Sequence, residues 1–218
     1  MDMERKITVK GTGNVSSRPD LIVIHMDLVS KAPRYEDTMT EAASAMSHLQ
    51  KAITRAGFDK TDLKTSDFSI DTEYESYRDR DENYRSRFVG YVCKQKTKLE
   101  FTLDTSKLSD VIEQISQSRA NPKLSIRFTM KDPNAIEDQL LVSAAENAKK
   151  RAELLAKGAG AELGDLLQID YTWGEIHLFS PTNVLYSQDV VYSESRMPEL
   201  EPDDIDVSDS ATFIWSLK

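Results

Sequence analysis

The stretch "ITVKGTGNVSSRPDLIVIHMDLVS", residues 7–30, places Gly11 and Gly13 directly after a short apolar run. A dinucleotide-binding turn needs a third glycine and a helix that starts at once, because the helix N-terminus holds the pyrophosphate. Ser16 stands where the third glycine would be, and Pro19 leads into a strand-like alternation of apolar residues. The stretch therefore predicts two β-strands joined by a hairpin or a wider β-connection, and it argues against a nucleotide site.

The remaining periodicities predict three helices and further strands. The helices are expected at about 34–56, 105–118 and 133–157, and the strands at 5–13, 20–30, 66–77, 86–103, 123–130, 166–173 and 210–217. Asp104 or Thr105 is expected to cap the second helix, and Asp132 to cap the third with Pro133 at its first position. The order ββ-α-ββ-α-β-α-β-β is typical of an α+β fold with two lobes of largely antiparallel sheet and helices on one face.

The long third helix has an alanine-rich apolar stripe, which predicts close packing against its neighbour. The stripe is expected at Leu141, Ala145, Ala148, Ala152 and Leu155. We expect a single domain over 1–218, with sub-lobes of about 1–95 and 96–218 that share the unusually long strand 86–103. The segment 175–207 shows no clear pattern, and its acidic run is expected to be a solvated linker.

Composition limits the classes of function. The chain has 28 Lys and Arg and 37 Asp and Glu, which gives a net charge of −9. Because such a chain repels polyanions, we expect no nucleic-acid partner. One cysteine excludes a disulfide framework within the chain. No apolar run reaches the length of a membrane span, and no signal peptide is recognisable, so the chain as written is expected to be cytoplasmic. A chain whose signal had been removed would look the same, and would be exported.

Few residues have the spacing that chemistry requires. The three histidines, His25, His48 and His177, show no metal-ligand spacing. The acidic run from Glu199 to Asp209 lacks the central glycine and final glutamate of an EF-hand. We therefore expect no catalytic residue, cofactor or metal. Cys93 is expected to be a buried thiol, with Lys94 and Lys96 on the opposite face of its strand.

Two segments place aromatic residues in otherwise polar sequence, which is the composition of a protein interface. "YESYRDRDENYRSR" interleaves tyrosines with arginines, although a solvated hairpin tip with internal ion pairs is an equal alternative. "NVLYSQDVVY", residues 183–192, could add a strand to a sheet edge in this protomer or another. The candidate interface residues are Tyr74, Tyr77, Arg80, Tyr84, Arg85, Val184, Tyr186, Val190 and Tyr192.

The element order and three stretches resemble the SIMPL-domain family. They are "ITVKGTGNVSSRPDLIVIHMDL", "FVGYVCKQKTKLEFTLDTSKL" and "SIRFTMKDPNAIEDQLLVSAAENAKKRAELLAKGAGAELGDLLQI", and the closing "SDSATFIWSL" is similar to the family's last strand. The resemblance implies a link of bacterial members to oxidative-stress defence, no established catalytic residues, frequent export, and association into oligomers or scaffolds.

Together these observations predict a non-enzymatic module that associates with itself or with a protein partner. Two alternatives stay open. One is a redox-linked enzyme or sensor that uses Cys93, which rapid labelling of the native thiol would favour. The other is a small-molecule carrier with a pocket between the lobes, which ligand-dependent thermal stabilisation would reveal.

Overall fold

The computed structural model describes residues 5–78, 82–172, 176–186 and 200–218. It contains two antiparallel sheets and three helices, which confirms the α+β prediction. The contacts divide the chain into two compact units. Unit 1 comprises residues 1–20, 129–181 and 202–218, and unit 2 comprises 21–128 and 182–201. The expected lobe boundary near residue 95 is therefore not where the contacts divide the chain, and the long strand 86–103 lies within unit 2.

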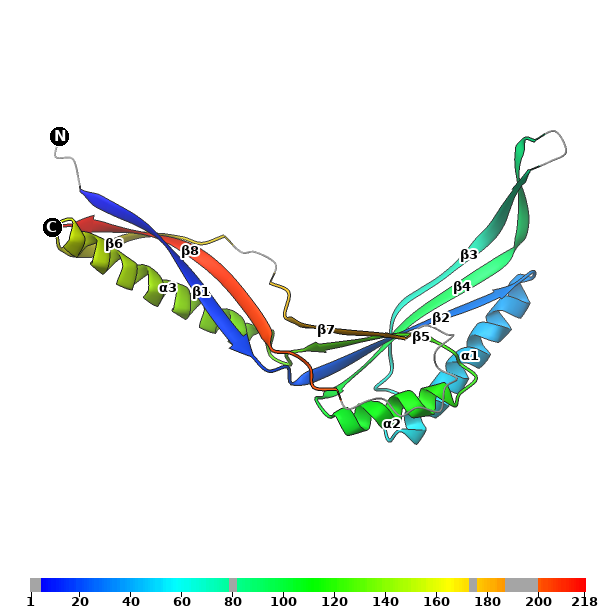
Figure 1. Ribbon diagram of the computed structural model, residues 1–218. Helices are drawn as coiled ribbons and strands as arrows, with labels where there is room; N and C mark the ends of the chain where they lie inside the picture. The colour runs from blue at the N-terminus through cyan, green and yellow to red at the C-terminus, as the bar shows by residue number, and fades with distance from the viewer. Residues whose placement is uncertain (1–4, 79–81, 173–175, 187–199) are drawn as a thin grey trace. The chain divides into compact units, whose positions relative to one another are not determined.

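Unit 1 is a three-stranded sheet in the order β1-β8-β6 with one helix, α3, on one face (Figure 1). Strand β1 (Lys6–Ser17) pairs along its whole length with β8 (Ile205–Leu217), and β6 (Leu163–Asp170) pairs with the other side of β8. Residues 205–209, which we expected in a solvated linker, belong to β8. The carboxylate of Asp209 accepts a 2.8 Å hydrogen bond from the Tyr171 hydroxyl, so this part of the acidic run is anchored.

The predicted β1–β2 hairpin is wrong, because β1 and β2 belong to different sheets. The two glycines serve a different purpose: they let α3 lie directly on β1. A Cβ on Gly11 would lie 2.1 Å from the carbonyl oxygen of Ala144, and one on Gly13 would lie 2.0 Å from that of Leu140. Both distances are far below van der Waals contact, so only glycine fits at these positions.

Helix α3 (Pro133–Gly158) begins as predicted, with Pro133 in its first turn and the Asp132 carboxylate accepting from the Ala135 N–H. Its buried stripe differs from the prediction. The buried residues recur every four positions, at Ile136, Leu140, Ala144, Ala148, Ala152 and Ala156, while Leu155 is exposed. The four-residue spacing follows one ridge of side chains, and this ridge lies on β1, with Ala144 and Ala148 at Gly11 and Leu140 at Gly13. The alanines on this ridge complement the glycines of β1.

Unit 2 is a five-stranded sheet in the order β3-β4-β2-β5-β7. Its strands are β2 (Leu21–Ala32), β3 (Lys64–Arg78), β4 (Tyr84–Thr102), β5 (Lys123–Thr129) and β7 (Phe179–Tyr186). The segment 183–192 was expected as a possible added strand at a sheet edge, and its first residues, 183–186, lie in β7 at the edge of this sheet. Helices α1 (Tyr35–Arg55) and α2 (Thr105–Ser116) cover one face (Figure 1). Asp104 caps α2 by accepting from the Lys107 N–H at 2.9 Å, as expected.

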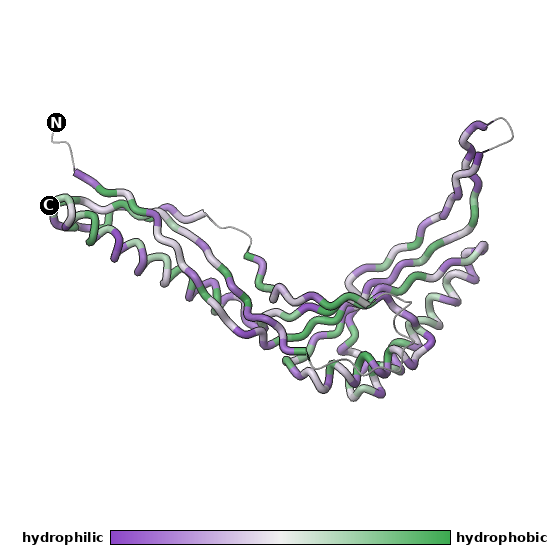
Figure 2. Tube along the Cα trace, in the orientation of Figure 1, coloured by the Kyte–Doolittle hydropathy of each residue, from purple (hydrophilic) through white to green (hydrophobic). Residues whose placement is uncertain are grey.

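The core of unit 2 lies between the sheet and these two helices. Alternate residues of β2, from Ile22 to Leu28, are buried against Leu49 and Ile53 of α1 and neighbouring core residues. Figure 2 shows the resulting alternation of hydrophobic and hydrophilic residues along the strands. The opposite face of β2 and β4 presents charged residues such as Asp27, Lys94 and Lys96. One face of this sheet is therefore a core and the other is polar.

Substitution of either glycine should destabilise the chain strongly, because the added methyl group meets helix backbone and not a flexible side chain. We expect Gly11→Ala and Gly13→Ala each to lower the free energy of unfolding by about 1–3 kcal/mol or more, measured by urea denaturation.

Gly158→Ala is the matched control, because a Cβ there has no atom within 4 Å. It should change the free energy of unfolding by less than about 1 kcal/mol. An equal effect at all three glycines would contradict the close-approach explanation.

Candidate functional site

The β3–β4 hairpin extends beyond the rest of the unit 2 sheet as a two-stranded ribbon (Figure 1). Pairing between β2 and β4 ends at Ala32 and Tyr91, whereas pairing between β3 and β4 continues from Glu73–Gly90 to Arg78–Tyr84. We call residues 73–78 and 82–90 the ribbon. Except for Glu73 and Gly90, every described residue of the ribbon is exposed. Since a two-stranded β-hairpin is marginally stable alone, the ribbon needs support at its base.

The base of the ribbon is fixed at Gly90 and Thr38. A Cβ at position 90 would lie 2.4 Å from the Ala32 carbonyl oxygen, so the end of β2 lies directly against β4. The Thr38 hydroxyl is fully buried; it donates to the Arg34 carbonyl at 3.0 Å and lies 3.5 Å from the Tyr91 carbonyl oxygen. These contacts hold the first turn of α1 against β4.

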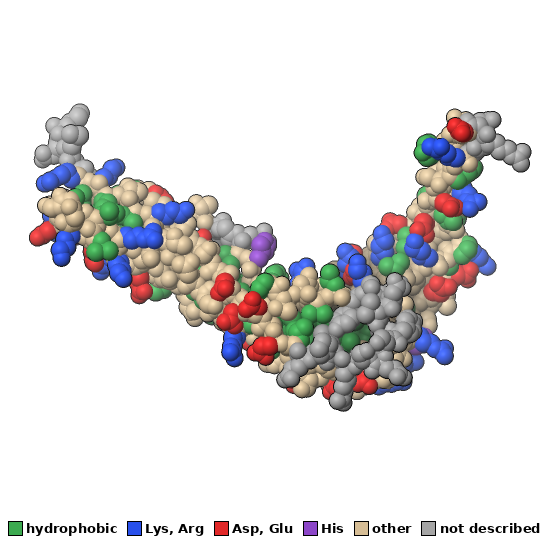
Figure 3. Space-filling model, in the orientation of Figure 1, with side chains coloured by type: hydrophobic (Ala, Val, Ile, Leu, Met, Phe, Trp, Pro, Cys, Tyr) green, Lys and Arg blue, Asp and Glu red, His purple; other side chains and the backbone are tan. Residues whose placement is uncertain are grey.

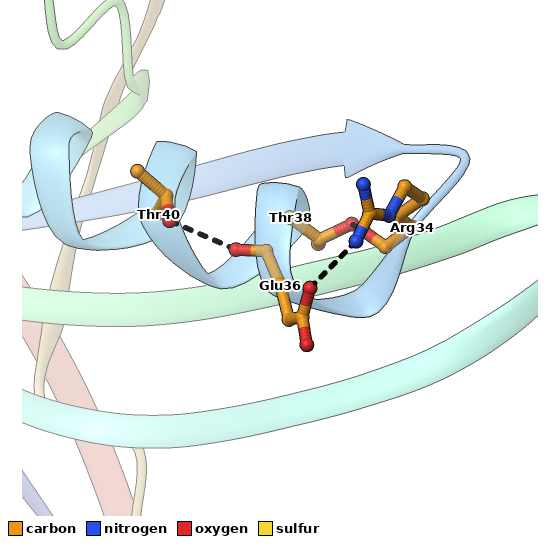
Figure 4. Close-up of polar contacts among 4 residues, drawn as sticks. All are labelled: Arg34, Glu36, Thr38 and Thr40. Atoms are coloured by element: carbon orange, nitrogen blue, oxygen red, sulfur yellow. Dashed lines mark hydrogen bonds and ion pairs between the residues drawn. The ribbon is translucent and has the colours of Figure 1, made fainter.

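The first turn of α1 has no side-chain cap at Arg34 and is stabilised by other polar contacts. The Arg34 guanidinium pairs with the Glu36 carboxylate at 2.8 Å, and the Thr40 hydroxyl donates to the Glu36 carbonyl at 2.9 Å. Figure 4 shows both contacts. This turn places Tyr35 beside Tyr91, with ring centroids 5.7 Å apart. The start of α1 therefore extends the aromatic surface of the ribbon.

Four aromatic rings lie in a row along one face of the ribbon base. Phe88 lies 5.3 Å from Tyr91 and 5.8 Å from Tyr74, and the edge-to-face geometry of each pair is the one that aromatic rings prefer. We call Tyr35, Tyr91, Phe88 and Tyr74 the aromatic row. Tyr74 is 59% exposed, and Tyr35 and Phe88 are also exposed. No described residue covers the row, so it is an ordered apolar surface facing solvent.

Arginine side chains order the outer part of the ribbon. Arg87 donates two hydrogen bonds to one oxygen of Glu75, at 2.7 and 3.0 Å, with its guanidinium 5.9 Å from the Tyr77 ring centre. Arg78 lies over the Tyr84 ring at 4.9 Å and donates to its hydroxyl at 2.8 Å. These pairs restrict Tyr77 and Tyr84, and Tyr84 is 74% exposed. Restricted side chains lose less entropy when a partner binds.

The structure places four of the predicted interface residues on the ribbon, and strand alternation puts Tyr74 and Tyr84 on one face and Tyr77 and Arg85 on the other. Val184 instead contacts the core of its own unit. Arg80, Val190, Tyr192 and the side chain of Tyr186 lie outside the described residues. Sequence reasoning missed Tyr35, Phe88 and Tyr91 as interface candidates. The alternation of residues across the hairpin could have suggested Phe88, but a register shift after Glu73 hides the pairing.

Cys93 is buried, as predicted, with 1% of its surface exposed. Burial raises the pKa of the thiol above its ordinary 9.0, which favours the protonated and unreactive form. Lys94 and Lys96 are exposed, and strand alternation places them on the opposite face. The arrangement therefore opposes the redox alternative that uses this residue.

The described histidines and acidic residues do not converge on a site. Within the described ranges no group of three or more His, Cys, Asp or Glu could hold a metal ion. His25 lies on the polar face of the unit 2 sheet. Its pKa is lowered from the ordinary 6.5, first by burial and then by the positive charges of Arg127 and Lys98.

Comparison with known proteins identifies the family of this chain. The sequence pattern of the family described as SIMPL, protein of unknown function (DUF541), matches residues 7–215. The "26 kDa periplasmic immunogenic protein" of Brucella melitensis biotype 1 is 24% identical over 167 residues, which cover 75% of this chain and 65% of the relative. The protein of that name from Brucella abortus strain S19 matches to the same extent. The chain thus spans about 65% of the length of these curated relatives. Their names place the relatives in the periplasm, and the expected cytoplasmic location gains no support from them.

The buried thiol should be protected in the folded protein. We expect Cys93 to react with a chromogenic disulfide reagent only after denaturant unfolds the chain, because the folded state excludes the reagent and disfavours the thiolate. Stoichiometric labelling of the native protein at neutral pH would revive the redox alternative.

His25 should make stability depend on pH. Because folding lowers its pKa, its contribution is fully present above the unfolded value of 6.5 and is lost as pH falls through the folded value. His25→Gln should therefore reduce the loss of stability between about pH 7.5 and about pH 5.5 in urea denaturation.

The same substitution at His48 of α1 is the control for this experiment. If His25→Gln left the pH dependence of unfolding unchanged, the lowered pKa would be contradicted.

Proposed function

This chain belongs to the SIMPL family, and on that premise we propose that it is a non-enzymatic module that associates with itself through the ribbon. The observation that carries the proposal is the aromatic row, an ordered and exposed apolar surface on a ribbon that nothing described covers. A contiguous exposed apolar surface of this kind is typical of a protein contact. A second copy of the chain is the proposed partner, and another protein is the alternative.

Energetics support this role for the ribbon. Removing apolar surface from water contributes about 25 cal/mol per Å², and large aromatic side chains offer much of it. Tyrosine and arginine are also the residues most often found at the energetic centres of interfaces. Tyr74, Tyr84 and Phe88 supply the rings, and Arg78 and Arg87 hold neighbouring tyrosines in place. Association that buries these rings would therefore also stabilise the ribbon.

Location and pathway belong to the proposal as well. Because the two Brucella relatives are named as periplasmic, we propose that this chain also works outside the cytoplasm. A role in stress defence follows from the family resemblance alone. Neither point changes the proposed contact, which depends on the aromatic row and the neighbouring residues of the ribbon.

Light scattering over a dilution series tests the proposal. We expect a discrete multiple of the 24.7 kDa chain mass at high protein concentration. Tyr74→Ser combined with Phe88→Ser should raise the dissociation constant of the oligomer at least about tenfold, because two aromatic anchors are removed.

The matched control is Phe68→Ser, which removes a half-exposed ring from β3 outside the ribbon. It should leave the oligomer intact. A monomer at every concentration, or equal losses from the ribbon and control variants, would contradict self-association through the ribbon.

A further inference from the structure

Basic side chains gather at the end of unit 1 where α3 ends and β1 begins, as Figure 3 shows. The chain as a whole carries a net charge of −9, so this gathering is a local feature against the overall composition. Between residues 149 and 158, Glu153 is the only acidic residue. The exposed basic residues at this end include Arg5, Lys6, Lys10, Lys149, Lys150, Arg151, Lys157 and Lys218.

Two leucines lie among these basic residues. Leu154 is 63% exposed and Leu155 is 57% exposed, and both lie close to the C-terminal end of α3. Residues three and four apart are neighbours on a helix surface, so Lys150, Arg151 and Lys157 surround Leu154. We call Lys150, Arg151, Leu154, Leu155 and Lys157 the basic leucine patch.

The patch is held in place by the packing of α3 on β1. Ala148, Ala152 and Ala156 face the sheet, so the two leucines fall outside the buried stripe. The Arg151 guanidinium donates to the carbonyl of Lys10 on β1 at 3.3 Å. The leucines are thus presented outward by a rigid element and have no core of their own to enter.

The composition of the patch distinguishes between two kinds of partner. Lysine is depleted at protein interfaces, and leucine is under-represented among their energetic centres. Helices that lie on membranes instead combine lysine and arginine with leucine, because the cations meet lipid phosphates and the apolar side chains enter the headgroup boundary. A lipid surface is therefore the partner that these residue types favour.

We propose that the basic leucine patch docks unit 1 on an anionic phospholipid membrane. Lysine stems reach along apolar surface while their ammonium groups stay with the phosphates, so Lys150 and Lys157 can bind while the leucines insert. No helix in the described part of the chain is long and apolar enough to cross a membrane. The contact is peripheral, and its residues are separate from those of the ribbon.

Vesicle co-sedimentation of the full chain tests the proposal. The probes are phosphatidylcholine vesicles with and without phosphatidylglycerol. We expect binding to the anionic vesicles alone at about 0.1 M salt and release at about 1 M, where charges are screened. Lys150→Glu combined with Lys157→Glu should weaken partition at least about tenfold, because each cation near the surface contributes to binding.

Two controls match these changes. Lys51→Glu combined with Lys60→Glu reverses two exposed charges of unit 2, outside the basic gathering, and Val142→Ser on α3 removes an apolar side chain of similar exposure, at 59%, for comparison with Leu154→Ser. Leu154→Ser should weaken vesicle binding severalfold. Each control variant should weaken vesicle binding less than the patch variant with which it is compared. Failure to bind anionic vesicles, or equal effects of patch and control variants, would overturn the proposal. Binding to an acidic protein without binding to vesicles would overturn it too.

Discussion

Strand β1 and helix α3 approach so closely that no side chain separates their backbones at Gly11 and Gly13. The rest of unit 1 depends on this contact. It brings the alanine ridge of α3 against the face of β1, while the edge of β1 pairs with β8 along its whole length. A helix seated on alanines also turns its larger residues outward, which is why Leu154 and Leu155 are exposed beside lysines. The packing constraint thus creates the surface that we propose binds lipid.

Features that depend on local chemistry could be predicted from the sequence. Asp104 and Asp132 cap helices as expected, because each carboxylate accepts a hydrogen bond from a backbone N–H only three residues later in the chain. Pairing between β1 and β8 could not be predicted, since those strands lie at opposite ends of the chain. The glycines fit a hairpin bend equally well until the neighbour of β1 is known. The buried stripe of α3 differs from the prediction because contacts with β1 select which ridge is buried, and the helix sequence alone does not record those contacts.

Only part of the candidate site could be predicted from the sequence. Tyr74, Tyr77 and Tyr84 stood out because aromatic residues are unusual in a polar hairpin. Tyr35 did not, since its place beside Tyr91 depends on how α1 begins after β2. Cys93 is buried, whereas the aromatic row and the basic leucine patch are exposed. The two proposals therefore rest on surface residues.

Amide hydrogen exchange at several protein concentrations tests the central claim most directly. If the ribbon is covered by a second copy, amides at 74–78 and 84–88 gain protection as concentration rises, while those of β1 and α3 stay unchanged. The predicted result is this local and concentration-dependent protection. Ribbon amides that exchange equally fast at every concentration would contradict the account.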